Sequence, residues 1–172
     1  DDAIAIKFFH ESGARSDINY RTLKESTARF STYLKTKIGA GDLVAAYMPN
    51  IPETIVSMLG VTSLGGIFTR TSPDFGIEGV VDRFGQSKPK ILVASLSYSY
   101  NGKVISQVEK IREIKKQVPS IEEVIVVDFL SSGENHEFTS WEKALESFEE
   151  INYVQRKFND PLYVMYSSGT TG

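Results

Sequence analysis

The chain has 172 residues, of which 41% are hydrophobic and 24% are charged, and its formal net charge is −3. This composition predicts one compact domain with a hydrophobic core rather than a disordered chain. The basic residues are spread along the sequence, so we expect no nucleic-acid partner. The sequence contains no cysteine, which excludes disulfides, thiolate metal sites and a cysteine nucleophile. Its two histidines, His10 and His136, lie far apart, and we expect surface residues there rather than a metal site.

The apolar runs are informative about location. The longest of them have the length of strands, so no segment is predicted to span a membrane. The first residues lack the basic start and the long apolar stretch of a secretory signal. Together with the lack of cysteine, these features predict a cytosolic location.

Strand-like and helix-like segments alternate along the chain. Short apolar runs predict strands at 3–9, 43–48, 67–69, 90–94, 124–127 and 162–166. Apolar residues at helical spacing predict helices at 19–38, 53–64, 77–86, 103–117 and 141–148. A polar surface loop is expected over 130–140. This alternation predicts an α/β fold: a doubly wound, mainly parallel sheet with helices on both faces.

Several residues carry signals for helix starts. Asn19 can cap the first helix, or Thr22 can cap it in a capping box with Glu25. Thr139 with Glu142 offers a second capping box, and Asp74 is expected to cap the helix after it.

Burial is predicted from the same spacing. We expect both Phe75 and Phe84 to be core aromatics, and Arg83 either to lie on a solvated helix face or to pair with a nearby carboxylate. In the helix at 53–64, the side chains predicted to face inward are Ile55, Met58, Leu59 and Thr62.

The clearest chemical pattern directly follows the last predicted strand. Six of the seven residues from 166 to 172 are glycine, serine or threonine, in the order YSSGTTG. Backbone N–H groups at glycine and side-chain hydroxyls bind phosphate oxygens, and ligands of parallel sheets bind beyond the carboxyl ends of the strands. The pattern therefore predicts an ATP phosphate site at Ser167, Ser168, Gly169, Thr170, Thr171 and Gly172. A flexible hydroxyl-rich turn would have the same composition, so both interpretations stay open on the residues alone.

Three better-known loops do not fit this segment. A Walker A loop requires a Gly-Lys-Ser/Thr step, which does not occur in the chain. The segment is also neither a G-x-G-x-x-G dinucleotide fingerprint nor a G-x-S-x-G hydrolase elbow.

Residues 166–172 resemble the opening of the signature loop of the acyl-adenylate-forming, AMP-binding superfamily. That superfamily includes acyl-CoA synthetases, luciferases and peptide-synthetase adenylation domains, and its motif continues to a lysine shortly after the last glycine. Residues 41–50, with GDLVA followed by MPN, and the helix ending at Gly66 resemble the outline common to the superfamily.

Three shorter stretches resemble acetoacetyl-CoA synthetases in particular. They are TSPDFG at 71–76, VDRFGQ at 81–86 and YNGK at 100–103. Arg70 departs from that group, which usually has a serine at this position.

The resemblance implies that residues 1–172 form an incomplete AMP-binding amino-terminal domain, with the carboxy-terminal domain absent. It implies an acid–thiol ligase that uses ATP, CoA and Mg²⁺ held through the ATP phosphates. Arg70 and Lys103 become candidate contacts for the CoA nucleotide, while no catalytic residue and no metal ligand are expected within the chain. Residues 1–172 alone should not turn over. Another short-chain acyl-CoA synthetase, a non-catalytic nucleotide-binding module, or a plain α/β domain remain as alternatives.

Overall fold

The computed structural model describes residues 1–166. At its centre lies a six-stranded sheet in which every neighbouring pair of strands is parallel. The order across the sheet is β10-β4-β3-β5-β8-β9. The strands are β3 (Leu43–Tyr47), β4 (Ile67–Thr71), β5 (Ile91–Ser95), β8 (Glu123–Val127), β9 (Thr139–Ser140) and β10 (Tyr163–Val164).

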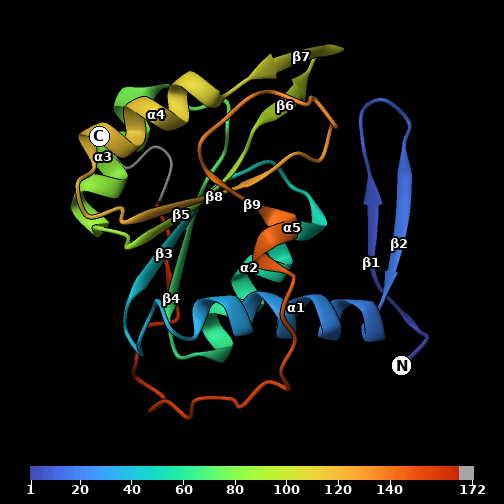
Figure 1. Ribbon diagram of the computed structural model, residues 1–172, viewed down its shortest axis with the longest axis vertical. Coiled ribbons are helices and arrows are strands. Elements are labelled where there is room, and N and C mark those ends of the chain that lie inside the picture. The colour runs from blue at the N-terminus through green and yellow to red at the C-terminus, as the bar shows by residue number, and fades with distance from the viewer. Residues whose placement is uncertain (167–172) are drawn as a thin grey trace.

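Helices cover both faces of this sheet, so the predicted fold class is confirmed (Figure 1). They are α1 (Tyr20–Leu34), α2 (Pro52–Ser63), α3 (Ile77–Ser87), α4 (Val108–Gln117) and α5 (Trp141–Ala144). Alternate side chains of each central strand point to opposite faces. One core therefore joins the sheet to α1, α2 and α5, and the other joins it to α3 and α4.

Two β-hairpins lie outside the main sheet. The first pairs β1 (Ile4–Phe9) with β2 (Arg15–Asn19), and β2 was not among the predicted strands. The second pairs β6 (Ser97–Tyr100) with β7 (Lys103–Ser106), which corrects the predicted helix start at Lys103. Asn101 and Gly102 have positive φ angles of 52° and 72°, as a two-residue Asn-Gly hairpin turn requires. The helix α4 begins only after this hairpin.

Of the three predicted helix caps, the structure confirms one and corrects two. Asn19 caps α1, because its side chain accepts a hydrogen bond from the Thr22 N–H at 2.8 Å. The cap of α5 is Ser140 rather than Thr139, and that helix ends at Ala144. Asp74 does not cap α3, which has Gly76 at this position without a side-chain hydrogen bond.

The inward face of α2 was predicted only in part, because Met58 packs against the core but Ile55 does not. Ile55 is 38% exposed, whereas Val56 and Val61 are buried and pack in the core. Small residues on this helix allow close contact with α1: a Cβ on Gly60 would lie 2.8 Å from Cδ1 of Phe30. Because α2 contacts both the sheet and α1, small polar residues are buried on it, and an apolar periodicity does not find that face.

A polar cluster closes the amino end of β8. The Glu123 carboxylate accepts hydrogen bonds from the hydroxyls of Tyr33 and Thr139 and forms an ion pair with Lys37 at 2.8 Å. Burial raises the pKa of Glu123, but the hydrogen bonds from Lys37, Tyr33 and Thr139 outweigh it and leave that pKa below its ordinary value.

Candidate functional site

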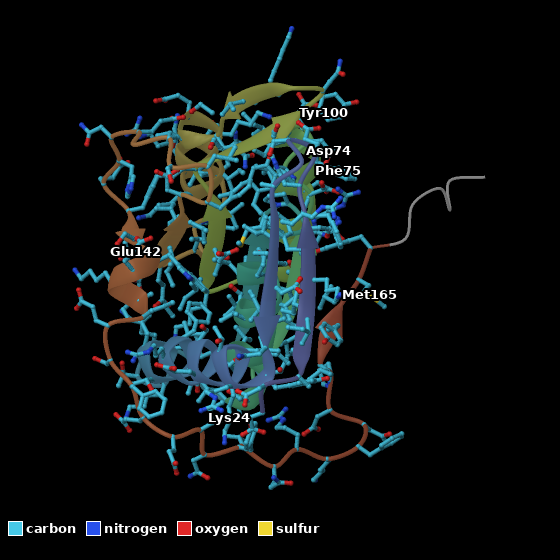
Figure 2. The ribbon with its side chains drawn as sticks, turned by 90° about the vertical axis from the view of Figure 1, so that its right-hand side faces the viewer. Lys24, Asp74, Phe75, Tyr100, Glu142 and Met165 are labelled. Carbon is cyan, nitrogen blue, oxygen red and sulfur yellow. The ribbon has the colours of Figure 1, made fainter. Side chains whose placement is uncertain are left out.

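The candidate site lies at the carboxyl ends of β10, β4 and β3, which are neighbours in the sheet. Because these strands are parallel, the segments that leave them emerge at the same edge. Figure 2 shows Asp74 and Phe75, which follow β4, toward the same end of the molecule as Tyr100 of the β6–β7 hairpin. The edge therefore gathers chain segments that are distant in sequence.

Strand β10 brings the end of the described chain to this edge. It pairs with β4 through Tyr163 opposite Phe68 and Val164 opposite Thr69. The Thr69 hydroxyl also donates a hydrogen bond to the Val164 carbonyl at 2.8 Å. The strand is shorter than the predicted 162–166, but its direction is the predicted one, so the following segment starts at a carboxyl end.

Tyr166 connects that segment to α3. Its hydroxyl donates a hydrogen bond of 2.7 Å to the backbone carbonyl of Arg83. The Arg83 guanidinium lies 5.4 Å from the centre of the Tyr166 ring and 4.1 Å from the centre of the Phe75 ring. Phe75 is 40% exposed, so the prediction of a core aromatic is wrong there, whereas Phe84 is fully buried as expected. The ring of Phe75 instead stacks against the Arg83 guanidinium.

Tyr47, at the end of β3, holds the loop that follows β4. This side chain is fully buried at the end of β3, and its hydroxyl lies 2.9 Å from the carbonyl oxygens of both Pro73 and Phe75. Burial raises the pKa of Tyr47, so the phenol stays protonated and donates. Tyr47 was not among the predicted site residues, because the whole strand at 43–48 was interpreted as apolar. A phenol at the end of a buried strand could have indicated a hydrogen bond to the next loop, because a buried hydroxyl needs a partner.

Arg70 holds the turn that follows β3. Its Nε and Nη2 atoms donate to the Met48 carbonyl at 3.0 and 2.9 Å. Burial lowers the pKa of the Arg70 guanidinium, and the charge of Asp74 opposes this effect. Two of the Arg70 N–H donors that could bind a ligand are thus already bonded to Met48.

Lys103 has different surroundings from Arg70. It is exposed, and it stands opposite Tyr100 in the hairpin that follows β5. The two candidate CoA contacts therefore come from separate segments of the edge, since β3 lies between β4 and β5. The predicted phosphate-binding residues, 167–172, lie outside the described residues.

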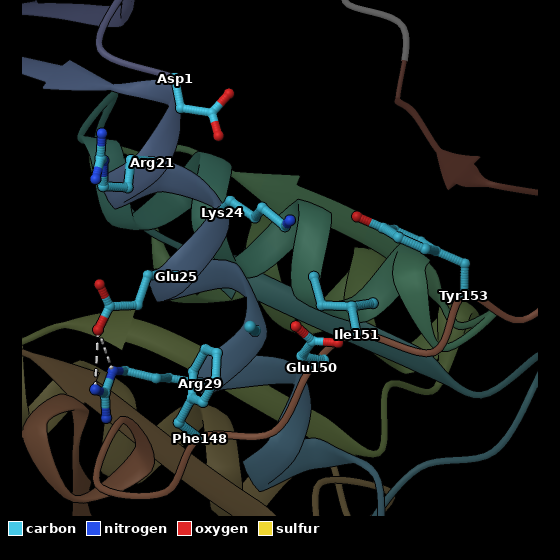
Figure 3. A pocket seen from close by; sticks show the side chains of 10 residues that line it. Asp1, Arg21, Lys24, Glu25, Arg29, Phe148, Glu150, Ile151 and Tyr153 are labelled. Atoms are coloured by element: carbon cyan, nitrogen blue, oxygen red, sulfur yellow. Dashed lines mark hydrogen bonds and ion pairs between the residues drawn. The ribbon is translucent and has the colours of Figure 1, made fainter.

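A cavity of about 430 Å³ lies elsewhere, between α1 and the segment 148–153 (Figure 3). Charged side chains of both signs line it, and Arg29 is held there by Glu25 at 2.9 Å. Figure 1 places α1 at the end of the molecule opposite the β6–β7 hairpin. This cavity is therefore remote from the carboxyl edge, and we do not assign the chemistry to it.

Two further observations concern residues 1–166 only. None of their helices combines the length and the apolar character that crossing a membrane requires. They also form no cluster of three or more histidine and carboxylate side chains that could hold a metal ion.

Comparison with protein families matches residues 1–172 to the family described as AMP-binding enzyme. An acetoacetyl-CoA synthetase from Xenopus tropicalis is 36% identical over 186 aligned residues, covering 100% of this chain and 28% of the relative. A malonamoyl-CoA synthetase from Penicillium aethiopicum is 34% identical, covering 100% of this chain and 26% of the relative. The chain thus spans little more than a quarter of the length of these curated relatives.

Solved structures give the same picture of the fold. An acetoacetyl-CoA synthetase from Streptomyces lividans superposes with a TM-score of 0.93 at 32% identity, over 99% of this chain and 27% of that one. An acyl-CoA synthetase from Brucella canis has a TM-score of 0.78 at 22% identity, over 99% of this chain and 30% of that one. The second likeness bears on the fold alone.

Proposed function

Because this chain belongs to the AMP-binding enzyme family, we propose that it is part of the amino-terminal, nucleotide-binding domain of an acid–thiol ligase. The relatives are three to four times longer, so residues 1–172 would form an incomplete domain that acts together with further chain. We propose that this longer enzyme is located in the cytosol and acts on small molecules.

The proposed reaction has two steps. A carboxylate oxygen of acetoacetate attacks the α-phosphorus of ATP, which gives acetoacetyl-AMP and releases pyrophosphate. The thiol of CoA then attacks the acyl carbon and displaces AMP, which gives acetoacetyl-CoA. The choice of acetoacetate rests on the acetoacetyl-CoA synthetases among the relatives and on the TSPDFG, VDRFGQ and YNGK stretches.

The observation that carries the proposal is the position of β10. Its carboxyl end delivers the chain, through Tyr166, to the edge where ligands of parallel sheets bind. We propose that Ser167–Gly172 hold the β- and γ-phosphates of ATP with N–H groups and hydroxyls, and stabilise charge on the departing pyrophosphate. Mg²⁺ would be held by the phosphate oxygens of ATP and would neutralise part of their charge.

The two candidate CoA contacts have unequal support. Lys103 is exposed at the carboxyl edge, and its ammonium can reach an anionic ligand. Arg70 already donates two hydrogen bonds to Met48, so its support for a ligand contact is weaker than that of Lys103. We therefore propose Lys103 as the contact to the CoA nucleotide phosphates, and keep Arg70 as a secondary candidate.

The direct test is ATP–pyrophosphate exchange by the full-length protein that contains these residues. Exchange should depend on the added acid and be fastest with acetoacetate, compared with acetate, propionate and malonamate. No exchange with any acid would refute the ligase proposal. Residues 1–172 alone should be silent, and clear exchange by that piece would contradict the proposed incomplete domain.

The loop has its own test in the same assay. Thr170→Val and Thr171→Val keep the side-chain size and remove a hydroxyl that would donate to phosphate. Each should raise the KM for ATP about fivefold, as expected for one hydrogen bond of about 1 kcal/mol. Thr22→Val, on the remote helix α1, is the matched control and should leave the KM unchanged. Equal KM values for all three variants would argue against the loop assignment.

One relative suggests malonamate as a second candidate substrate. The malonamoyl-CoA synthetase is as similar to this chain as several acetoacetyl-CoA synthetases, at 34% identity. Faster exchange with malonamate than with acetoacetate would select that substrate, and the adenylation chemistry would remain the same. A non-catalytic nucleotide-binding module would instead bind ATP without exchange in the full-length protein.

A further inference from the structure

Three side chains connect the end of the described chain to α3, and we call them the α3 anchor. They are Phe75, Arg83 and Tyr166. The Tyr166 hydroxyl donates to the Arg83 carbonyl at 2.7 Å, while the guanidinium of the same arginine lies over both aromatic rings. One residue of α3 thus holds both the polar tip and the ring of Tyr166.

We propose that Tyr166, held by the α3 anchor, is a positioning residue for MgATP that sets where the phosphate-binding loop starts. This inference rests on the proposed function, because it concerns the same loop. It assigns no contact between Tyr166 and the nucleotide. Its role is to fix the residue that immediately precedes Ser167.

The chain near the loop has few other attachments. Strand β10 has only two residues in the ladder with β4, Tyr163 and Val164. The next residue, Met165, is 87% exposed, and Figure 2 shows its side chain pointing away from the sheet. Tyr166 is therefore the last described residue whose side chain ties the segment to the domain. Without that contact, only the two-residue pairing of β10 with β4 would hold Tyr166 in place.

The anchor itself is attached to the core. Phe84, the neighbour of Arg83 in α3, is fully buried and fixes that part of the helix. Phe75 is fixed from the other side, because Tyr47 contacts the carbonyl oxygens of Pro73 and Phe75. A binding group must be held to within about 0.5 Å to be effective, and these contacts provide such a frame.

Charge gives the anchor a second effect. Among residues 1–166, Arg83 forms no ion pair with a carboxylate, so its positive charge is not neutralised by a described neighbour. A guanidinium keeps its charge while stacking on aromatic rings. It therefore adds positive potential beside the start of a loop that is proposed to receive polyphosphate.

Removal of the Tyr166 hydroxyl should disturb position more than stability. The Arg83 carbonyl also accepts a hydrogen bond from the Ser87 hydroxyl at 2.9 Å, so it keeps a partner in Tyr166→Phe. A role limited to stability would lower the unfolding midpoint and reduce all kinetic parameters through loss of folded enzyme. A positioning role would change the KM for MgATP at an unchanged midpoint.

The experiment uses the full-length protein that contains these residues and compares Tyr166→Phe with Tyr163→Phe. The control removes a phenol hydroxyl from the same segment, but that hydroxyl contacts the Met58 sulfur instead of α3. In acetoacetate-dependent exchange, Tyr166→Phe should raise the KM for MgATP about fivefold, the loss expected for one hydrogen bond. The KM for acetoacetate and the thermal midpoint should match those of wild type, and Tyr163→Phe should match wild type throughout.

Arg83 variants test the other half of the anchor. Arg83→Met keeps much of the side-chain length but loses the charge and the planar group, and should raise the KM for MgATP at least as much as Tyr166→Phe. Arg83→Lys restores the charge and should recover part of this loss, in a salt-dependent manner.

The possible failures are distinguishable. If wild type shows no exchange with any acid, the proposed function fails, and the inference that rests on it fails too. If wild type is active and Tyr166→Phe keeps the wild-type KM for MgATP, the positioning role alone is refuted. The same holds if Tyr166→Phe and Tyr163→Phe raise that KM equally, or if only the thermal midpoint falls.

Discussion

Substitution of Tyr47 by phenylalanine removes one oxygen atom from the core and tests how the carboxyl edge is held together. The ring stays in place among buried residues between the sheet and α3 and α4. What is lost is the hydroxyl that lies 2.9 Å from the carbonyl oxygens of Pro73 and Phe75. The loop after β4 then loses these hydrogen bonds to β3.

The size of the effect follows from the two carbonyl groups. A hydrogen bond of this kind contributes about 1 kcal/mol net, and a buried carbonyl left without a partner costs about 1–3 kcal/mol. Pro73 is buried whereas Phe75 is exposed, so water can replace the hydroxyl at only one of the two carbonyls. We therefore expect Tyr47→Phe to lower the free energy of unfolding by about 2 kcal/mol, or the melting temperature by about 4–8 °C.

Urea unfolding followed by tryptophan fluorescence measures this loss. The chain has a single tryptophan, Trp141, which is buried against Phe30 on the opposite face of the sheet from Tyr47. Tyr100→Phe is the matched control, because Tyr100 is 64% exposed, and it should change the free energy of unfolding by less than about 0.5 kcal/mol. A Tyr47→Phe loss no larger than that of the control would refute the reasoning.

Three further substitutions test the local structure by the same unfolding assay. Asn19→Ala removes the cap of α1 and should cost about 1 kcal/mol, whereas Asn19→Asp should retain most of the stability; equal losses would contradict the capping role. Gly60→Ala should destabilise by about 1–3 kcal/mol despite its better helix propensity, because the new Cβ would lie 2.8 Å from Cδ1 of Phe30; a gain in stability would show that the ring yields freely. Glu123 has a folded pKa below its unfolded value of about 4.5, so its contribution is complete above that pH and is lost as the pH falls through the folded pKa. The stability difference between wild type and Glu123→Gln should therefore be constant from about pH 6 to 8 and shrink below about pH 4.5, and a difference that grows on acidification would contradict this sign.

Much of the sheet could be predicted because its strands are short, apolar and buried on both faces. The segments at 43–48 and 124–127 contain little but aliphatic residues, and the structure makes both of them central strands. Right-handed crossover connections limit the possible orders of the strands but do not determine which one forms. The return of β10 to the edge beside β4 is a contact between residues almost a hundred positions apart, and no local pattern encodes it.

The errors have local causes. An apolar spacing at 103–117 suggested one helix, although Asn101 and Gly102 are the residues that a tight hairpin turn prefers. Phe75 was assigned to the core by its residue type, but its position depends on a cation from another element, Arg83. The direction of the last strand was predicted correctly from the chain alone, and the phosphate site beyond it stays a prediction. The partners of Tyr47 and Tyr166 could not be predicted, because they are backbone carbonyls that only the fold brings near.

The late position of β10 has a consequence for synthesis of the protein. Every other strand of the main sheet, from β3 to β9, is synthesised before Tyr163, so most of the sheet can assemble before β10 joins it. Residues 145–162 must then cross from α5 to the far edge before β10 can pair with β4. The outermost strand on the β4 side would thus join the sheet only in this final docking event, after the core has already formed.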